Sequence, residues 1–151
     1  MNLILRLPMT NNHINEIIKC TNSCEYFIKT YITIHLSKED IEFIKSLEYG
    51  NYHIIASPEN SHNTLLMHLM IMWKMLFKSS DSVYLIMTSK MTHTHDYINR
   101  FKTYYNMLPE WMKIDIKRDS ARYIILSNGN ILSTGIYSPD SIIGFNPMKI
   151  S

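Results

Sequence analysis

Two short runs of β-branched residues, each followed by a longer apolar or amphipathic segment, constrain the fold more than any other feature of the sequence. Tyr52–Ala56 and Ser82–Met87 have the composition of buried strands. Asn63–Phe77 is apolar on nearly all sides and predicts a central helix, and Lys90–Leu108 predicts a second helix that ends at Pro109. Strand, helix, strand, helix is typical of an α/β domain with parallel strands.

The pattern changes after the second of these helices. The segment RYIILSNGNILSTGIY contains two β-rich runs joined by Asn128 and Gly129. This dipeptide between apolar runs is typical of a type I′ turn. The sequence therefore predicts a β-hairpin toward the C-terminal end.

The segment NNHINEIIKCTN, residues 11–22, has isoleucines at helical spacing and predicts a short amphipathic helix. We expect Asn11 or Asn12 to cap it, because asparagine is a favoured N-cap residue. The three isoleucines are Ile14, Ile17 and Ile18.

Two further segments precede the first predicted strand. Residues 24–34 mix aromatic and β-branched side chains, so their periodicity fits a helix as well as a strand. Ser37 and Asp40 form a start similar to a capping box. They predict a helix with an apolar stripe that ends before Gly50.

Length and charge limit the classes of protein that fit. A chain of 151 residues is long enough for one domain with a real core and too short for two ordinary ones. Fifteen basic and thirteen acidic residues give a formal charge of +2, far below that of a protein that holds nucleic acid mainly through phosphates. DNA binding would need a local patch, and such clusters are usually solvated faces. The one local cluster consists of Lys113, Lys117, Arg118 and Arg122.

The sequence predicts neither a metal site nor a membrane span. Cys20 and Cys24 lack a second cysteine or histidine pair at zinc-site spacing, so we expect free thiols in a reducing cytosol. His93 and His95 are two residues apart in a predicted helix and point to different sides of it. The longest apolar run is interrupted by a histidine and a lysine, which argues against a membrane-spanning helix.

A polar loop joins the first predicted strand to the central helix, at the position where many nucleotide-binding proteins carry a glycine-rich loop ending in Gly-Lys-Ser or Gly-Lys-Thr. This loop contains neither glycine nor lysine. Its residues are Ser57, Pro58, Glu59, Asn60, Ser61, His62, Asn63 and Thr64.

Four stretches together resemble the N-terminal ATPase region of the large terminase subunits of tailed phages, the motors that package DNA into capsids. CEYFIKTYITI is similar to the aromatic segment before that family's adenine-side motif, and HIIASPENSHNT occupies the place of its strand and phosphate loop. VYLIMTSKMTHTHDYINRFKTYYNMLPEWM is similar to the next strand and helix, and IILSNGNILSTGIYSPDSIIG to the hairpin and following loop. The likeness covers roughly residues 24–145.

The residues that differ from the family's pattern are those that would carry out its chemistry. Where the family has the glycine, the lysine and the hydroxyl that holds Mg²⁺, this chain has Ser61, His62 and Asn63. Pro58 stands in place of an arginine, and Ile143 replaces the arginine of an Arg-Gly pair. A phosphate loop without these groups lacks most of the charge stabilisation that phosphoryl transfer needs.

The resemblance implies one domain over residues 1–151 with a truncated P-loop NTPase-like α/β fold, parallel strands and a C-terminal β-hairpin. We expect the domain to lack the acidic Walker B half and the nuclease domain. It also implies a pseudo-ATPase with no catalytic residues, no metal and no cofactor beyond weak ATP binding.

The leading hypothesis is a non-catalytic terminase-like protein of a phage or phage satellite. It would act in the cytoplasm of an infected bacterial host, bind the large terminase or the portal, and modulate or inhibit packaging. An open sheet edge would also permit self-association. Two alternatives are a split ATPase fragment completed in trans and a DNA-binding accessory protein that uses the basic cluster.

Overall fold

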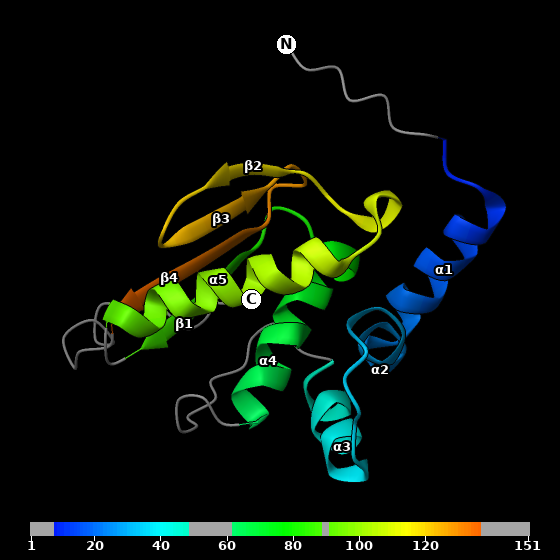
Figure 1. Ribbon diagram of the computed structural model, residues 1–151, viewed down its shortest axis with the longest axis horizontal. Coiled ribbons are helices and arrows are strands. Elements are labelled where there is room, and N and C mark those ends of the chain that lie inside the picture. Colours follow the sequence, from blue (N-terminus) through cyan, green and yellow to red (C-terminus); the bar gives the residue numbers. More distant parts are fainter. Residues whose placement is uncertain (1–7, 49–61, 89–90, 137–151) are drawn as a thin grey trace.

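The computed structural model describes residues 8–48, 62–88 and 91–136. Its elements are ordered along the chain as coloured in Figure 1. The predicted strand Tyr52–Ala56 lies outside the described residues. None of the described helices has the length and apolar content that a membrane crossing requires.

Among the described residues, four strands form one mixed sheet in the order β1-β4-β3-β2. Strand β1 runs parallel to β4, whereas β4 with β3 and β3 with β2 are antiparallel. This confirms the mixed α/β class, the strand predicted at Ser82–Met87 and the C-terminal hairpin. The strands are β1 (Val83–Thr88), β2 (Ile116–Asp119), β3 (Tyr123–Leu126) and β4 (Ile131–Ile136).

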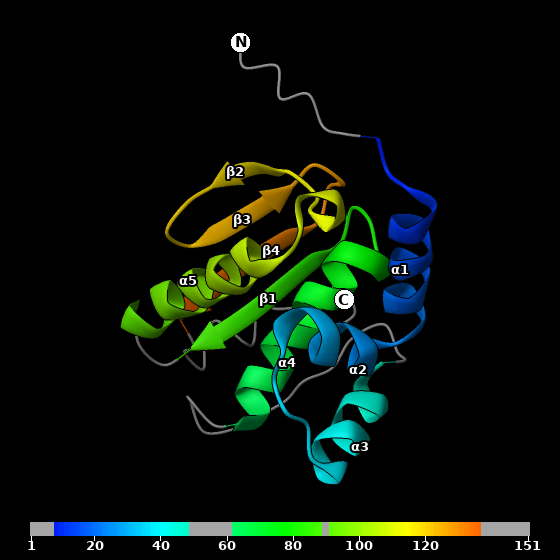
Figure 2. The same ribbon diagram turned by 45° about the vertical axis from the view of Figure 1, so that its right-hand side comes forward.

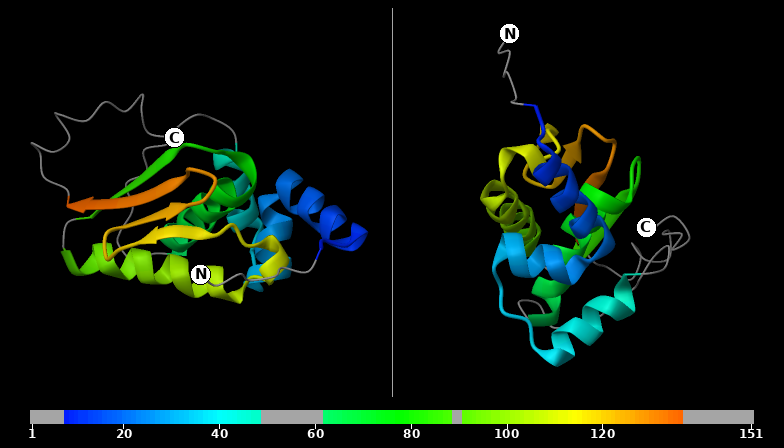
Figure 3. Two further views of the ribbon diagram at one scale, coloured as in Figure 1. Left: turned by 90° about the horizontal axis from the view of Figure 1, so that it is seen from above. Right: turned by 90° about the vertical axis from the view of Figure 1, so that its right-hand side faces the viewer.

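Helix α5 (Met91–Met107) lies between β1 and β2 in the chain and packs against β1 and β4, as Figures 2 and 3 show. Alternate strand residues face it and are buried, among them Tyr84, Ile86 and Leu132. The short helix η3 (Glu110–Met112) follows α5 after Pro109. The predicted second helix is thus confirmed, with its end at the expected proline.

The central helix α4 (His62–Trp73) continues as a π-helical turn, η2 (Lys74–Lys78). Its hydrophobic side chains point in all directions because it packs between other elements, including α3 and α5. The methionines and the tryptophan of this helix are mainly core residues. Those buried are Met70, Met72, Trp73 and Met75.

The hairpin between β3 and β4 forms where Asn128 and Gly129 predict it, but the type I′ assignment is wrong. Type I′ requires positive φ at both central residues. Gly129 has φ of +88°, whereas Asn128 is not among the residues with positive φ. The Gly129 N–H donates to the Leu126 carbonyl at 3.0 Å, which closes a turn centred on Ser127 and Asn128. The glycine then follows this turn in a left-handed conformation, an arrangement common in longer hairpins.

Two asparagines of the hairpin loop hold it against the end of η2. The side-chain amides of Asn128 and Asn130 both donate to the Met75 carbonyl, at 2.9 and 2.8 Å. Asn130 is fully buried, and its amide also donates to the Ser79 carbonyl at 2.8 Å. Carbonyls at a helix end lack partners within the helix, and here the hairpin supplies them.

The helices of the N-terminal part pack beside the end of α4 (Figures 1 and 2). The segment after Ser23 is helical, so the choice left open between helix and strand is settled in favour of helix. The predicted capping box between Ser37 and Asp40 is present, with a 3.1 Å bond from the Asp40 N–H to the Ser37 hydroxyl. The elements are α1 (Asn11–Asn22), α2 (Cys24–Phe27), η1 (Ile28–Ile32) and α3 (Lys38–Leu47).

The predicted cap of α1 is wrong. Thr10, not Asn11 or Asn12, is the N-cap, because its hydroxyl accepts from the His13 N–H at 3.2 Å. The His13 ring returns the interaction by accepting from the Thr10 N–H. Threonine followed three residues later by a histidine acceptor thus acts like a capping box, although the usual Glu or Gln is absent.

Candidate functional site

Of the residues predicted to form a degenerate phosphate loop, the described ones are at the start of α4. His62 is exposed, and its Nε2 lies 3.0 Å from the Asp40 carboxylate on α3. Asn63 is also exposed, and Thr64 is buried. The other residues of the predicted loop lie outside the described residues, as does Ile143. They are Ser57, Pro58, Glu59, Asn60 and Ser61.

The Asp40 carboxylate accepts hydrogen bonds from two groups, the Ser37 N–H and the His62 ring. Burial alone would raise the pKa of Asp40, but the hydrogen bonds from the Ser37 N–H and from His62 outweigh burial and hold it below the ordinary value. A carboxylate that stays ionised here stabilises the start of α3 and accepts from His62. His62 at the start of α4 therefore bridges two helices through the Asp40 carboxylate on α3.

The basic cluster is not a single face of free cations. Lys113 bonds to Glu110 at 2.7 Å, and only 12% of its side chain is exposed. Lys117, Arg118 and Arg122 are exposed on β2 and the turn after it. Asp119 on the same strand adds a negative charge. The local positive charge is thus smaller than the sequence cluster suggested.

Helix α1 has an unexpected orientation. The side chains facing the body of the protein are partly polar: His13 stacks on Trp111 with ring centroids 4.4 Å apart. Glu16 accepts from the hydroxyls of Tyr26 and Tyr31, each at 2.8 Å. Because polar side chains occupy the inner face, part of the isoleucine stripe points outward.

The outward side of α1 is apolar at its centre. Ile14 and Ile18, one helical turn apart, are 46% and 51% exposed, whereas Ile17 is half-buried. Met9, just before the helix, is 51% exposed. We define Met9, Ile14 and Ile18 as the α1 face. Isoleucines at this spacing are usually read as a core stripe, and no local signal in the sequence distinguishes the two orientations.

The predicted free thiols are confirmed. Cys20 and Cys24 are fully buried and unbridged. Burial raises the pKa of the Cys20 thiol from 9.0 to about 12, and burial raises that of Cys24 as well. The backbone beside them is also anchored, because the Trp73 indole donates to the Cys20 carbonyl at 2.6 Å.

The two histidines of the THTHD segment differ in exposure. His95 is exposed on α5, and His93 is half-buried. Within residues 8–48, 62–88 and 91–136, no three histidine, cysteine or acidic side chains are grouped as a metal ion would need.

No family model and no curated protein matches this chain. The described residues thus form a small mixed α/β scaffold with a histidine–carboxylate bridge at the start of α4 and an exposed apolar helix face on α1.

Proposed function

We propose that this protein acts by binding another protein, and that the contact is made by the α1 face. The observation that carries the proposal is the exposure of Ile14 and Ile18 on a helix whose inner side is held by polar contacts. Isoleucines at i and i+4 are the anchors with which a helix enters an apolar groove of a partner.

The size of the α1 face suits this role. Burying an isoleucine side chain fully contributes about 1.5–3 kcal/mol, so two half-exposed isoleucines and a methionine can anchor a contact. Polar and charged residues surround them, as at the rim of a protein interface. The surrounding residues are Asn11, Asn12, Asn15, Lys19 and Asn22.

We propose the packaging machinery of a tailed phage as the partner, most specifically the large terminase and secondly the portal. The support is the resemblance of the four sequence stretches to the terminase ATPase region. A scaffold with the outline of a motor domain but without the phosphate-loop lysine would occupy a motor subunit's place and modulate or inhibit packaging. In this proposal the protein acts in the cytoplasm of an infected bacterium.

The test compares two variants in co-purification with large terminase and portal proteins. Ile14→Ser combined with Ile18→Ser should lower retention of the partner at least about tenfold, because the lost apolar burial exceeds 1.4 kcal/mol. Met107→Ser removes an equally exposed methionine, 50% exposed, from the end of α5 and should leave binding unchanged. Equal loss in both variants would overturn the role of the α1 face.

A second measurement addresses the partner class. If the protein binds neither terminase nor portal, leaves packaging unaffected, and binds duplex DNA with a steep salt dependence, the role of a DNA-binding accessory replaces the one proposed here. Variants of the exposed Lys117 and Arg118 would then weaken binding and reduce the salt slope.

We also propose that the protein does not hydrolyse ATP. His62, at the position of the phosphate-binding lysine, is shorter than lysine and is bonded to Asp40. We expect no magnesium-dependent ATP turnover, measured as phosphate release with the protein alone and with its partner. Turnover that disappears in His62→Ala would contradict this. Turnover that appears only with a partner would favour the split ATPase fragment.

A further inference from the structure

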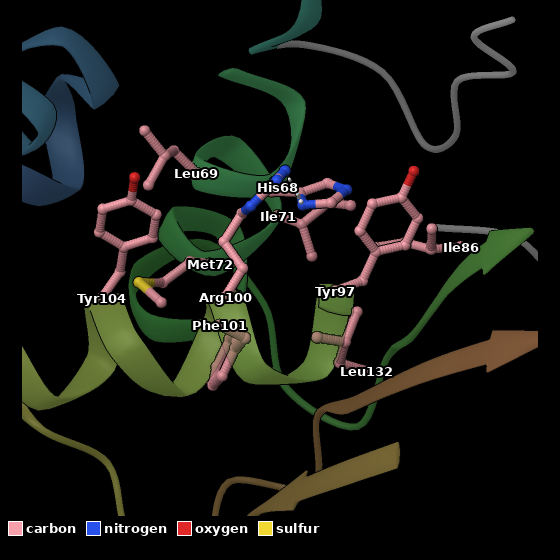
Figure 4. A pocket seen from close by; sticks show the side chains of 10 residues that line it. All are labelled: His68, Leu69, Ile71, Met72, Ile86, Tyr97, Arg100, Phe101, Tyr104 and Leu132. Atoms are coloured by element: carbon pink, nitrogen blue, oxygen red, sulfur yellow. Dashed lines mark hydrogen bonds between the residues drawn. The ribbon is translucent and has the colours of Figure 1, made fainter. Parts of the chain in front are cut away.

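The face of the sheet that points away from α4 and α5 is apolar. Ile86 on β1 and Leu132 on β4 point toward these two helices and line a small cavity with His68 of α4 and Arg100 of α5 (Figure 4). Successive strand residues point to opposite sides of a sheet, so the residues between the buried ones form the other face. We define the far sheet face by six of them: Val83, Leu85, Met87, Tyr123, Ile125 and Ile131.

The strand register joins these side chains into one surface. Val83 and Ile125 both lie beside Ile131, one on each side of β4. The other two β4 residues on this face, Ser133 and Gly135, are small and uncharged. Strands β1, β4 and β3 therefore present a continuous surface in which none of these residues is charged.

The far sheet face is not part of the core that the described residues form. Val83 is 43% exposed, and the other five members are half-buried. In the described part of the chain, none of the six belongs to the hydrophobic core or to the partly buried side chains packed against it. Parallel strands that are apolar on both sides are typical of sheets covered on both faces. We therefore expect a further element to cover this face.

The α1 face is a complementary surface in the same chain. It is an exposed apolar helix face, and a helix on an apolar sheet face is the usual layer arrangement of α/β proteins. The 12 residues of α1 are about 18 Å long, and the 6 residues of β1 span about 20 Å, so the lengths match. Lys19, the one charged residue exposed on α1, already pairs with Glu16 at 3.4 Å.

The two surfaces of one copy do not meet. The stacking of His13 on Trp111 and the hydrogen bonds of Glu16 hold α1 against its own chain. Ile14 and Ile18 are exposed on the outer side of the docked helix. A contact within one copy would require α1 to detach, whereas a second copy can supply the docked helix as it is.

We propose that the far sheet face of one copy of this protein binds the α1 face of a second copy. The contact joins two different surfaces, so each copy can bind two others and association continues beyond a dimer. It uses the α1 face of the proposed function but does not rest on the phage partner. The copy at one end of such an assembly keeps its α1 face free for that partner.

The test is sedimentation velocity of the full-length protein alone, in a concentration series up to about 1 mM, because small interfaces are often weak. We expect the average mass to rise with concentration and to exceed that of a dimer. Ile14→Ser combined with Ile18→Ser, and separately Val83→Lys, should each weaken this association at least about tenfold. Each change removes apolar burial, and the lysine also places a charge on the far sheet face.

Mixing the two variants shows which surfaces meet. The Ile14→Ser/Ile18→Ser variant keeps the far sheet face, and the Val83→Lys variant keeps the α1 face. Neither should associate alone, but an equimolar mixture should form a one-to-one dimer and nothing larger. The matched control is Ile136→Lys, because Ile136 is 41% exposed and alternation places it on the opposite face of β4. It should associate as the natural protein does.

Four outcomes would overturn the proposal. A natural protein that stays monomeric would mean that a different occupant covers the far sheet face. Association that persists in either variant alone would indicate a contact between identical surfaces. A mixture of folded variants without the one-to-one dimer, or an equal loss in Ile136→Lys, would also contradict it. If Val83→Lys lacks the circular dichroism of the natural protein, Leu85→Thr, with its β-branched side chain, replaces it in the same mixture.

Discussion

Gly129 has the backbone conformation and the surroundings that exclude a side chain. Its φ of +88° is one that other residues rarely adopt, and a Cβ added there would collide with the Asp81 carboxylate. Asp81 is itself left-handed, with φ of 52°, a conformation that costs free energy for a residue with a Cβ.

Gly129→Ala is therefore expected to lower the free energy of unfolding by about 2–3 kcal/mol, from the backbone strain and the displaced Asp81. Denaturant unfolding monitored by circular dichroism measures this. Gly135→Ala on β4 is the matched control, because its new Cβ would meet only the flexible Met87 side chain at 3.1 Å. A loss of the same size in both variants would contradict the argument.

At the scale of elements, the Glu16 carboxylate contributes to the docking of α1. The hydroxyl of Tyr26, then that of Tyr31, lowers the pKa of Glu16 below its ordinary value of 4.5. Because the folded pKa is the lower one, the ionised carboxylate stabilises the docked helix. This contribution is fully present above about pH 4.5 and is lost as the pH falls through the folded pKa.

We expect the contacts of α1 to loosen in acid before the sheet unfolds. The indole N–H signal of Trp111, which stacks on His13 of α1, reports this locally, while strand amides report the sheet. Glu16→Gln should remove the acid-dependent change of the Trp111 signal assigned to this carboxyl. If the acid transition of the Trp111 signal keeps its midpoint and amplitude in that variant, the transition does not originate at Glu16.

The comparison of sequence with structure is also clearest at this scale. Elements with a local signal were predictable: β1 from its β-branched run, α3 from its capping box, the hairpin from Asn128 and Gly129. The turn type was not predictable, because the loop must also place the side-chain amides of Asn128 and Asn130 against the Met75 carbonyl. Met75 is 53 and 55 residues away from them in the sequence. A contact this distant in sequence has no local signature.

The candidate sites followed the same rule. The α1 face was missed because its isoleucines have ordinary core spacing, whereas contacts of His13 with Trp111 and of Glu16 with two tyrosines, all distant in sequence, set the orientation of the helix. His68 on α4 and Arg100 on α5 are 32 residues apart in the sequence. Their contact was missed because it also has no local signature. The assignment of residues 57–64 as a degenerate phosphate loop stays a prediction, because residues 57–61 lie outside the described part of the chain.

At the scale of the whole molecule, the two thiols report on the integrity of the core. Cys20 and Cys24 are both fully buried where α1 and α2 pack near Trp73. A thiol whose pKa is raised by burial is also a poor nucleophile at neutral pH.

We therefore expect a thiol reagent to modify both cysteines only through opening of the helices that cover them. The rate should follow the unfolding equilibrium as denaturant is added. Cys20→Ser and Cys24→Ser, each with one thiol left, assign the two rates. Rapid modification of either thiol without denaturant, at the rate of a free cysteine, would show that the N-terminal helices are not closed over the core.

The hydrogen bonds from two asparagine amides to the Met75 carbonyl also affect the order in which parts of the chain fold during synthesis. Helix α4 and its π-helical turn leave the ribosome well before Asn128 and Asn130 are made, so the carbonyls at the end of η2 first have only water as a partner. Closing a loop of this length carries an entropic cost before the contact forms. The end of α4 and the hairpin should consequently become protected from hydrogen exchange together and late, as one cooperative unit of folding.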